Sequence, residues 1–272
     1  AAWVNEQYLP DGETAARVEE IRRRGYTVIE NAYTPDEVEY TKRAIDTIYA
    51  DQLEQSGGQK ELEKSGDANI ARQLLAYDEF FLGKATNPQV IDIVRSTMGE
   101  YFILYQQNGN LNRPNISNMT APWHRDLTFW HMTSSRPLAL SALHIVSAFT
   151  KENGAVWILP GSQKEEAFPS FPFVDANKEL LVAPAGSICV FDSMMFHCSG
   201  TNITDEIRYS INHMYTMPLI TQQISLPRML DGKWNDDPFL RGFLGYNCMQ
   251  QASVKEWRSE KVKNARKQLK VK

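Results

Sequence analysis

The spacing of hydrophobic positions changes about one third of the way along the chain. Up to about residue 100, apolar residues recur every three or four positions, the period of an amphipathic helix. The second predicted helix opens with a capping box, in which Thr34 is the N-cap, Pro35 occupies the first turn and Glu37 reaches back. The glycine-rich, charged stretch 56–66 predicts a mobile loop. Helices are therefore predicted over four segments, 13–24, 34–54, 69–82 and 87–98.

From Tyr101 onward the hydrophobic period becomes two, which is the alternation of β-strands. Sequences rich in Gly, Pro and Asn separate the strands, as at 152–154, 160–162 and 184–186. Strands are predicted over five segments, 101–111, 137–149, 155–159, 186–191 and 207–217. Because helices come first and strands later, without strand–helix–strand alternation, the pattern favours a β-sandwich flanked by helices, an α+β class that is mainly β.

The length fits one domain built from these parts, since β-sandwiches and barrels commonly reach 272 residues. We predict a helical part over about 1–100 and a β core over about 101–218. An irregular segment, 222–251, mixes Pro, Gly, Trp and Phe, and 254–269 has a helical pattern. These last segments predict a lid and a closing helix over about 219–272.

Composition excludes several classes of function. The net charge of −4 and the pI near 5.8 argue against nucleic acid as a partner, because phosphate binding needs a basic face. The basic block 261–272 is interleaved with polar residues and is typical of a solvated helix face. No apolar run approaches the ~18 residues of a membrane span, and no signal segment opens the chain. Three cysteines without CxxC spacing predict reduced thiols in a cytoplasmic protein. The pattern does not fix an oligomeric state.

Three residues have the pattern of a metal site. His124 and Asp126 are two positions apart, so on a strand their side chains project to the same side and can hold one ion. A distant histidine, His197, follows a buried strand and completes a set of two histidines and one carboxylate. This facial triad holds non-haem Fe(II) and leaves the opposite coordination positions open for substrate and oxygen.

An arginine after the second histidine indicates which cosubstrate this metal site would use. Arg208 lies eleven positions after His197 (208 − 197), at the start of the last predicted strand. Alternation places a polar series on one face of that strand: Arg208, Ser210, Asn212, Met214 and Thr216. An arginine buried on that face requires an anion. Its guanidinium suits a carboxylate, which indicates a dicarboxylate cosubstrate such as 2-oxoglutarate.

The other histidines are weaker candidates. His213 faces away from Arg208, and His144 shares its strand face with leucine, alanine and valine, as a packed core histidine does. His131 lies just beyond the metal motif and is a candidate for substrate contact. Zinc is the competing metal for a His-Asp-His set, and the arginine favours iron with an oxo-acid instead.

Taken together, residues 107–216 resemble the phytanoyl-CoA dioxygenase family of Fe(II)/2-oxoglutarate-dependent oxygenases. The matching motifs, in order, are His124-x-Asp126, the turn Asn153-Gly154, the segment 159–162, the approach 184–187 to His197, and Arg208. The resemblance implies a double-stranded β-helix, the jelly-roll or cupin-like fold, over the core 101–218. It also implies that Ser199 assists Arg208 at the far carboxylate of 2-oxoglutarate.

The segment 123–131 is similar to that of ectoine hydroxylases within this family. In that branch, the residues matching Trp130 and Gln107 contact the substrate. The chain departs from the branch at Arg125 and Leu127-Thr128, where ectoine hydroxylases carry Ser and Phe-Glu. We therefore do not expect an ectoine hydroxylase. Family halogenases lack the triad carboxylate, so the presence of Asp126 favours hydroxylation or a related oxidation over halogenation.

The predicted function is oxidation of a small organic or natural-product substrate, with Fe(II) as cofactor and 2-oxoglutarate and O2 as cosubstrates. Succinate and CO2 would be released. The same chemistry also serves desaturation, ring closure and endoperoxide formation, and these remain open. Two other classes remain as well: a jelly-roll binding protein without catalysis, and a zinc hydrolase on the same ligands. We expect the substrate pocket to lie between the mouth of the barrel, the loop 56–66 and the segment 222–251.

Overall fold

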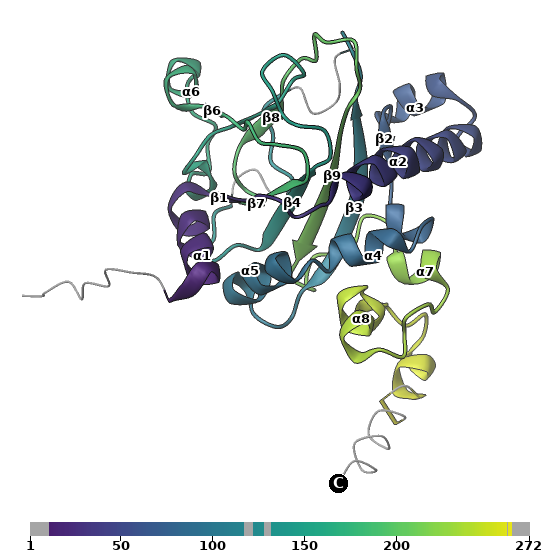
Figure 1. The fold of residues 1–272 in the computed structure, drawn as a ribbon. Coiled ribbons are helices and arrows are strands. Elements are labelled where there is room, and N and C mark those ends of the chain that lie inside the picture. The colour runs from purple at the N-terminus through teal and green to yellow at the C-terminus, as the bar shows by residue number, and fades with distance from the viewer. Residues whose placement is uncertain (1–10, 117–121, 128–131, 260, 263–272) are drawn as a thin grey trace, which may run out of the picture.

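The computed structural model describes residues 11–116, 122–127, 132–259 and 261–262. Two antiparallel sheets form a jelly roll, and helices cover the outer face of the larger sheet (Figure 1). The fold class predicted from the alternating pattern is therefore confirmed. This architecture brings the metal-site candidates together, although they lie far apart in sequence.

The larger sheet has six strands in the order β1-β7-β4-β9-β3-β2, and the smaller has three in the order β6-β5-β8. In chain order the strands are β1 Tyr26–Ile29, β2 Ile70–Ala71, β3 Ile103–Asn112, β4 Ala139–Ile145, β5 Val156–Ile158, β6 Glu179–Leu180, β7 Ser187–Asp192, β8 His197–Ser199 and β9 Arg208–Thr216. An isolated bridge between His124 and His197 adds the metal motif to the edge of the smaller sheet.

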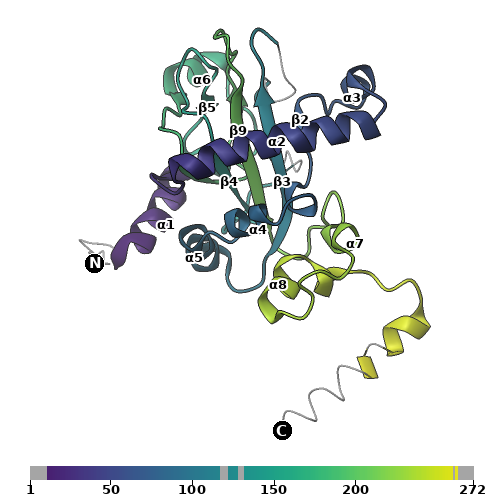
Figure 2. The ribbon, with the colours of Figure 1, turned by 45° about the vertical axis from the view of Figure 1, so that its right-hand side comes forward.

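Most of the helices lie before the third strand. They are α1 Gly12–Arg24, α2 Pro35–Gln55, α3 Gln59–Ser65, α4 Phe80–Ala85, α5 Pro88–Met98, α6 Phe171–Asn177, α7 Leu226–Leu230 and α8 Pro238–Phe243, with short 3₁₀ turns η1 Leu74–Ala76, η2 Ser162–Lys164 and η3 Tyr246–Cys248. The helix α2 crosses the strands of the larger sheet (Figure 2). Ile45 of α2 lies so close to Gly109 of β3 that a Cβ there would be 3.1 Å from it. Glycine therefore permits this close packing.

Alternation along the strands gives each sheet face its own core. Outward side chains of β4, β7 and β9 join the helices in one large cluster that includes Ile45, Leu140 and Ile211. Inward side chains, including Leu143 and Phe191, pack between the two sheets in a second cluster. This second cluster sets the spacing of the sheets, so the inward residues of β8 and β9 lie close enough to share a site.

Most predicted elements are confirmed, and two predictions are wrong in part. The capping box is present: the Thr34 backbone N–H donates to Glu37 Oε2 at 2.8 Å, and the Glu37 N–H donates to Thr34 Oγ1 at 3.3 Å. The predicted helix 69–82 is instead β2, η1 and the start of α4, because tertiary pairing with β3 overrides the local pattern. The predicted loop 56–66 contains α3, and the four-residue strand β1 was not predicted.

The C-terminal part matches its prediction less closely. The irregular segment contains α7, α8 and η3, and residues 254–259 are helical, while half of the predicted closing helix lies outside the described residues. Across the described ranges, no helix has both the length and the apolar character needed to cross a membrane. Cys189, Cys198 and Cys248 are unpaired, as the cysteine pattern predicted.

Candidate metal and cosubstrate site

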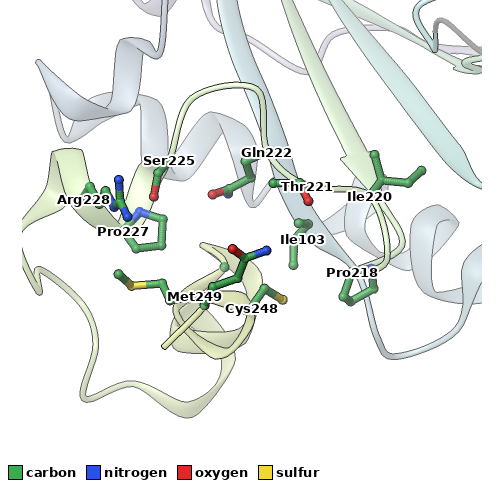
Figure 3. Close-up of a pocket in the computed structure, with 12 residues that line it drawn as sticks. Ile103, Pro218, Ile220, Thr221, Gln222, Ser225, Pro227, Arg228, Cys248 and Met249 are labelled. Atoms are coloured by element: carbon green, nitrogen blue, oxygen red, sulfur yellow. The ribbon is translucent and has the colours of Figure 1, made fainter. Parts of the chain in front are cut away.

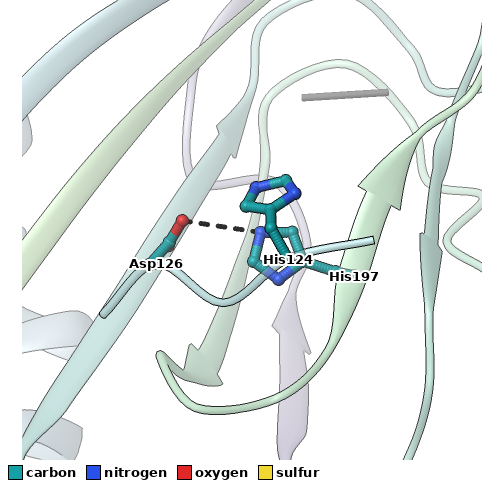
Figure 4. A group of neighbouring side chains, drawn as sticks. All are labelled: His124, Asp126 and His197. Atoms are coloured by element: carbon teal, nitrogen blue, oxygen red, sulfur yellow. Dashed lines mark ion pairs between the residues drawn. The ribbon is translucent and has the colours of Figure 1, made fainter. Parts of the chain in front are cut away.

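The three predicted metal ligands come together at the edge of the smaller sheet. The His124 N–H donates to His197 O at 2.9 Å, and the His197 N–H donates to His124 O at 3.0 Å. This pairing extends the backbone at His124, so Asp126 projects to the same side, as the two-residue spacing predicted. One ligand atom from each of the three side chains lies within 4.8 Å of the others (Figure 4). That spacing suits a single metal ion.

Both imidazoles are oriented by backbone carbonyls. His124 Nδ1 lies 2.8 Å from Pro122 O, and His197 Nδ1 lies 2.9 Å from Met195 O. A carbonyl only accepts, so each Nδ1 carries the proton and each Nε2 keeps its lone pair for a metal. Such bonds fix the tautomer and the ring direction of metal-binding histidines.

Asp126 is held by two neutral donors on the larger sheet. Ser141 of β4 donates to its Oδ2, and Asn212 Nδ2 of β9 donates to the same oxygen at 3.1 Å. The other oxygen, Oδ1, faces His197 Nε2 at 3.5 Å. Burial alone would raise the pKa of this carboxyl, but the two imidazoles and the Ser141 hydroxyl lower it below its usual range. Asp126 is therefore ionised, and Oδ1 points toward the ligand cluster.

The pKa values of His124 and His197 shift in opposite directions in this environment. Burial and the neighbouring His197 lower the pKa of His124, which keeps it neutral. Burial would also lower the pKa of His197, but the facing carboxylate of Asp126 outweighs it and raises that pKa. A metal ion would replace the proton that Asp126 otherwise favours on His197.

Arg208 is almost fully buried, at 4% exposure, at the start of β9. Its Nη2 donates to Ser199 Oγ at 3.0 Å, and its guanidinium lies 4.3 Å from the centre of the Phe149 ring. Its Nε and Nη1 are buried and have no hydrogen-bond partner within the described part of the chain. Burial lowers the pKa of Arg208 to about 9, so the group remains a cation at neutral pH. A buried cation with unused donors fits a carboxylate ligand.

Sequence reasoning did not assign Ser141 or Asn112 to the site, and it placed Asn212 on the polar face of β9 without giving it a role. Ser141 and Asn212 hold Asp126, and Asn112 Nδ2 donates to Ser199 Oγ at 3.5 Å and to Gly200 O at 3.2 Å. Alternation on the strand 137–149 places Ser141 on the inward face, which was a usable signal. No sequence pattern, however, connects Ser141 to Asp126.

The prediction for Gln107 needs correction. Its side chain is fully buried on the helix-covered face of β3, where it accepts from the Leu75 N–H at 2.7 Å and donates to Phe81 O at 2.9 Å. Its amide nitrogen also lies 2.6 Å from His213 Nε2. Gln107 is thus occupied by structural contacts and does not point toward the metal ligands. The other two substrate candidates, Trp130 and His131, lie outside the described residues.

His144 and His213 occupy that same outer face, as strand parity predicted. His213 Nδ1 lies 2.6 Å from His144 Nε2, and His144 Nδ1 lies 2.6 Å from Tyr33 Oη. The direction of this network follows from Gln107, whose amide donates to His213. Gln107 therefore donates a hydrogen bond to His213, His213 donates one to His144, and His144 donates one to Tyr33. Both imidazoles are neutral in this arrangement.

A pocket is present beside the segment 222–251, but it is separate from the metal ligands. Figure 3 shows it between the start of β3 at Ile103, the loop after β9 and the α7 and η3 region. Its volume is about 240 Å³, and its lining includes Gln222, Arg228 and Met249. Neither the ligand residues nor α3 contribute to it. The predicted location of the substrate pocket is therefore not supported by this cavity.

Comparison with known families decides the identity. The family model described as phytanoyl-CoA dioxygenase (PhyH) matches residues 21–210. The chain belongs to the phytanoyl-CoA dioxygenase family. It is an Fe(II)- and 2-oxoglutarate-dependent dioxygenase, with O2 as the second cosubstrate, and its His-Asp-His cluster and buried arginine fit that chemistry.

Relatives of this dioxygenase include proteins with and without an assigned activity. An uncharacterised protein of Mycobacterium tuberculosis is 28% identical over 212 residues, covering 76% of each chain. An ectoine dioxygenase of Stutzerimonas stutzeri is 25% identical over 232 residues, covering 74% of this chain and 76% of the relative. The structure of EctD from S. alaskensis with 2-oxoglutarate and 5-hydroxyectoine matches with a TM-score of 0.62 at 21% identity, covering 80% of each chain. The structural match supports the jelly-roll fold.

Proposed function

We propose that this dioxygenase hydroxylates a small organic or natural-product substrate in the cytoplasm, with release of succinate and CO2. When bound, iron and 2-oxoglutarate supply the activation of dioxygen that oxidises the substrate. The observation that carries the proposal is the combination of the His-Asp-His cluster with the unpaired donors of Arg208.

His124, Asp126 and His197 are the residues that would hold Fe(II). Their Nε2 and Oδ1 atoms converge, and the opposite atoms of each group are engaged by the protein. A rigid ligand set needs little reorganisation when the metal binds. The set would supply three protein ligands to the ion, the number that non-haem Fe(II) oxygenases use.

Arg208 and Ser199 would hold the distal carboxylate of 2-oxoglutarate. The Arg208 donors Nε and Nη1 are available, while Nη2 is fixed by Ser199. Phe149 stacks against the guanidinium and keeps water from one of its faces. A carboxylate at this position would neutralise the buried charge and satisfy the unused donors, so binding should be strong and specific.

The carboxylate of Asp126 favours hydroxylation over halogenation, because a halide would need its coordination position. Desaturation, ring closure and endoperoxide formation start from the same iron and cosubstrate set. They differ in where the substrate presents its reacting carbon. Product analysis by mass spectrometry distinguishes them, since hydroxylation adds one oxygen atom and desaturation removes two hydrogen atoms.

Anaerobic addition of Fe(II) and 2-oxoglutarate tests the site. The wild-type protein should develop a weak visible band near roughly 500 nm, and Asp126→Ala should lose it because one metal ligand is missing. Arg208→Ala should keep iron binding but weaken 2-oxoglutarate about a hundredfold, the loss expected for two charge-assisted hydrogen bonds. The exposed variant Arg23→Ala is the matched control and should behave as wild type. Zinc-dependent hydrolysis without a visible band in the wild type would refute the proposal.

A further inference from the structure

A second, larger pocket lies beside the metal motif, between residues of the segment 122–127 and residues 166–171 that lead into α6. Its volume is about 790 Å³, within the range of roughly 300–1,000 Å³ typical of small-molecule sites. His124 lines it together with aromatic and aliphatic side chains: Trp123, Leu127, Phe168, Phe171 and Phe196. His124 is therefore common to the pocket and the candidate iron site.

Phe168 is the centre of the aromatic wall. Its ring lies perpendicular to Phe196 with centroids 4.9 Å apart, and its centroid is 6.0 Å from Trp123 and 6.1 Å from Phe171. Phe168 is 37% exposed and Phe171 is 70% exposed. Large apolar side chains grouped around an open hollow are unfavourable in water and are typical of a ligand-binding surface.

Arg125 belongs to the metal motif and contacts residues that surround the pocket. It lies between His124 and Asp126 in sequence, and its guanidinium is 3.9 Å from the centre of the Phe196 ring. It donates to Ser162 O at 3.1 Å and to Glu166 O at 3.2 Å, the start of the segment that carries Phe168. Its charge is thus engaged by backbone carbonyls, and the pocket wall is apolar beside it.

We infer that this pocket binds an apolar, ring-bearing part of the substrate, which names a substrate class and rests on the proposed function. Flat rings pack favourably edge-on or offset against Trp123 and Phe168. The lining offers aromatic faces rather than a free cation for an acidic ligand. Of the three candidate ligand residues, His124 lines the pocket, and a molecule bound there would lie beside that residue.

Binding of a naphthalene probe tests the inference without iron. Titration of the iron-free protein with N-phenyl-1-naphthylamine, which carries no charge, should show saturable fluorescence, and Phe171→Ser should raise the Kd about fivefold through loss of one aromatic contact. Phe173→Ser is the matched control, because Phe173 lies on the same helix α6, is 53% exposed and does not line the pocket. It should bind the probe as wild type does. Equal Kd values for the two variants would overturn the inference.

A second measurement connects the pocket to the iron site. Addition of the probe to the anaerobic protein with Fe(II) and 2-oxoglutarate should shift the visible band in the wild type and in Phe173→Ser, and less in Phe171→Ser. A band that forms but never responds to the probe would refute the link to the oxidising centre, while the proposed function would stand. Failure of the band to form, with intact probe binding, would refute the proposed function and leave a ligand pocket.

Discussion

At the scale of single residues, the site depends on hydrogen bonds that orient the metal-ligand side chains toward one point. Asp126 Oδ2 accepts from Ser141 and Asn212, which leaves Oδ1 facing His197. Neither donor is charged, so they orient the carboxylate without neutralising it. A freely rotating carboxylate would lose entropy when the metal binds, and these two contacts remove that cost in advance.

Removal of either donor should weaken metal binding. In Ser141→Ala and in Asn212→Leu we expect the Fe(II) affinity to fall roughly tenfold to a hundredfold, the usual effect of losing a group that orients a ligand. Chelator competition measures the change. Ser210→Ala is the control, since Ser210 lies on the same inward face of β9. Unchanged iron affinity in both variants would contradict the assigned positioning role.

At the scale of elements, one irregularity in β3 decides which residues face the site. The pairing of β3 with β9 shifts between Leu104 and Gln106. Residues paired across two strands face the same side of the sheet. Before the shift, the odd-numbered Ile103 pairs with Thr216, which faces inward. After the shift, the even-numbered Asn108 pairs with inward-facing Asn212, while Gln107 pairs with outward-facing His213. A β-bulge adds one residue and reverses the parity of everything beyond it. Unbroken alternation would have turned Gln107 toward the interior.

The corrected position of Gln107 gives a direct test. Gln107→Met keeps the volume but leaves the Leu75 N–H, Phe81 O and His213 without partners. We expect a loss of about 3 kcal/mol in the free energy of unfolding. Affinities for Fe(II) and 2-oxoglutarate should be unchanged, because Gln107 lies on the other face of the sheet. Urea denaturation with metal titration measures both, and altered cosubstrate binding with normal stability would place Gln107 in the site after all.

At the scale of the whole molecule, the helices and the larger sheet are joined by the buried network from Gln107 to Tyr33. It links η1 and α4 to β3, β9 and β4, and then to the segment before α2. Burial lowers the pKa of His213 to about 3 and holds the pKa of His144 well below its usual range. Protonation of His213 would place an N–H against the Gln107 amide, so the fold depends on neutral histidines.

This dependence predicts acid sensitivity. The unfolded chain takes up protons on His144 and His213 below pH about 6.5, whereas the folded protein does not. The stability contributed by His213 should therefore be complete above that pH and fall as pH drops from about 6.5 toward 3, by about 2 kcal/mol at pH 5, and His144 acts in the same direction. Asp192 acts in the opposite direction, because burial raises its pKa to about 6. Urea midpoints at pH 7.5 and 5 measure the slope, and the double variant His144→Gln, His213→Gln should flatten it. An equal slope in that variant would exclude the two histidines as its source.

The sequence by itself determined the residues that can carry the chemistry and the faces on which most of them lie. The spacing of His124 and Asp126, the position of Arg208 and the parity of β9 are local properties of an extended chain, so they can be read without coordinates. The capping box at Thr34 is local for the same reason. The family resemblance rested on these short motifs, and the family match confirmed it.

Only the tertiary structure decided which distant groups meet. The contact of Asp126 with Ser141 and Asn212 depends on the packing of one sheet over the other. The reversal at Gln107 depends on a bulge that pairing with β9 creates. The aromatic pocket joins the metal motif to residues about forty positions later through Arg125. Hydrophobic periodicity records which side of an element is buried, but the partner on that side is set by how the elements pack.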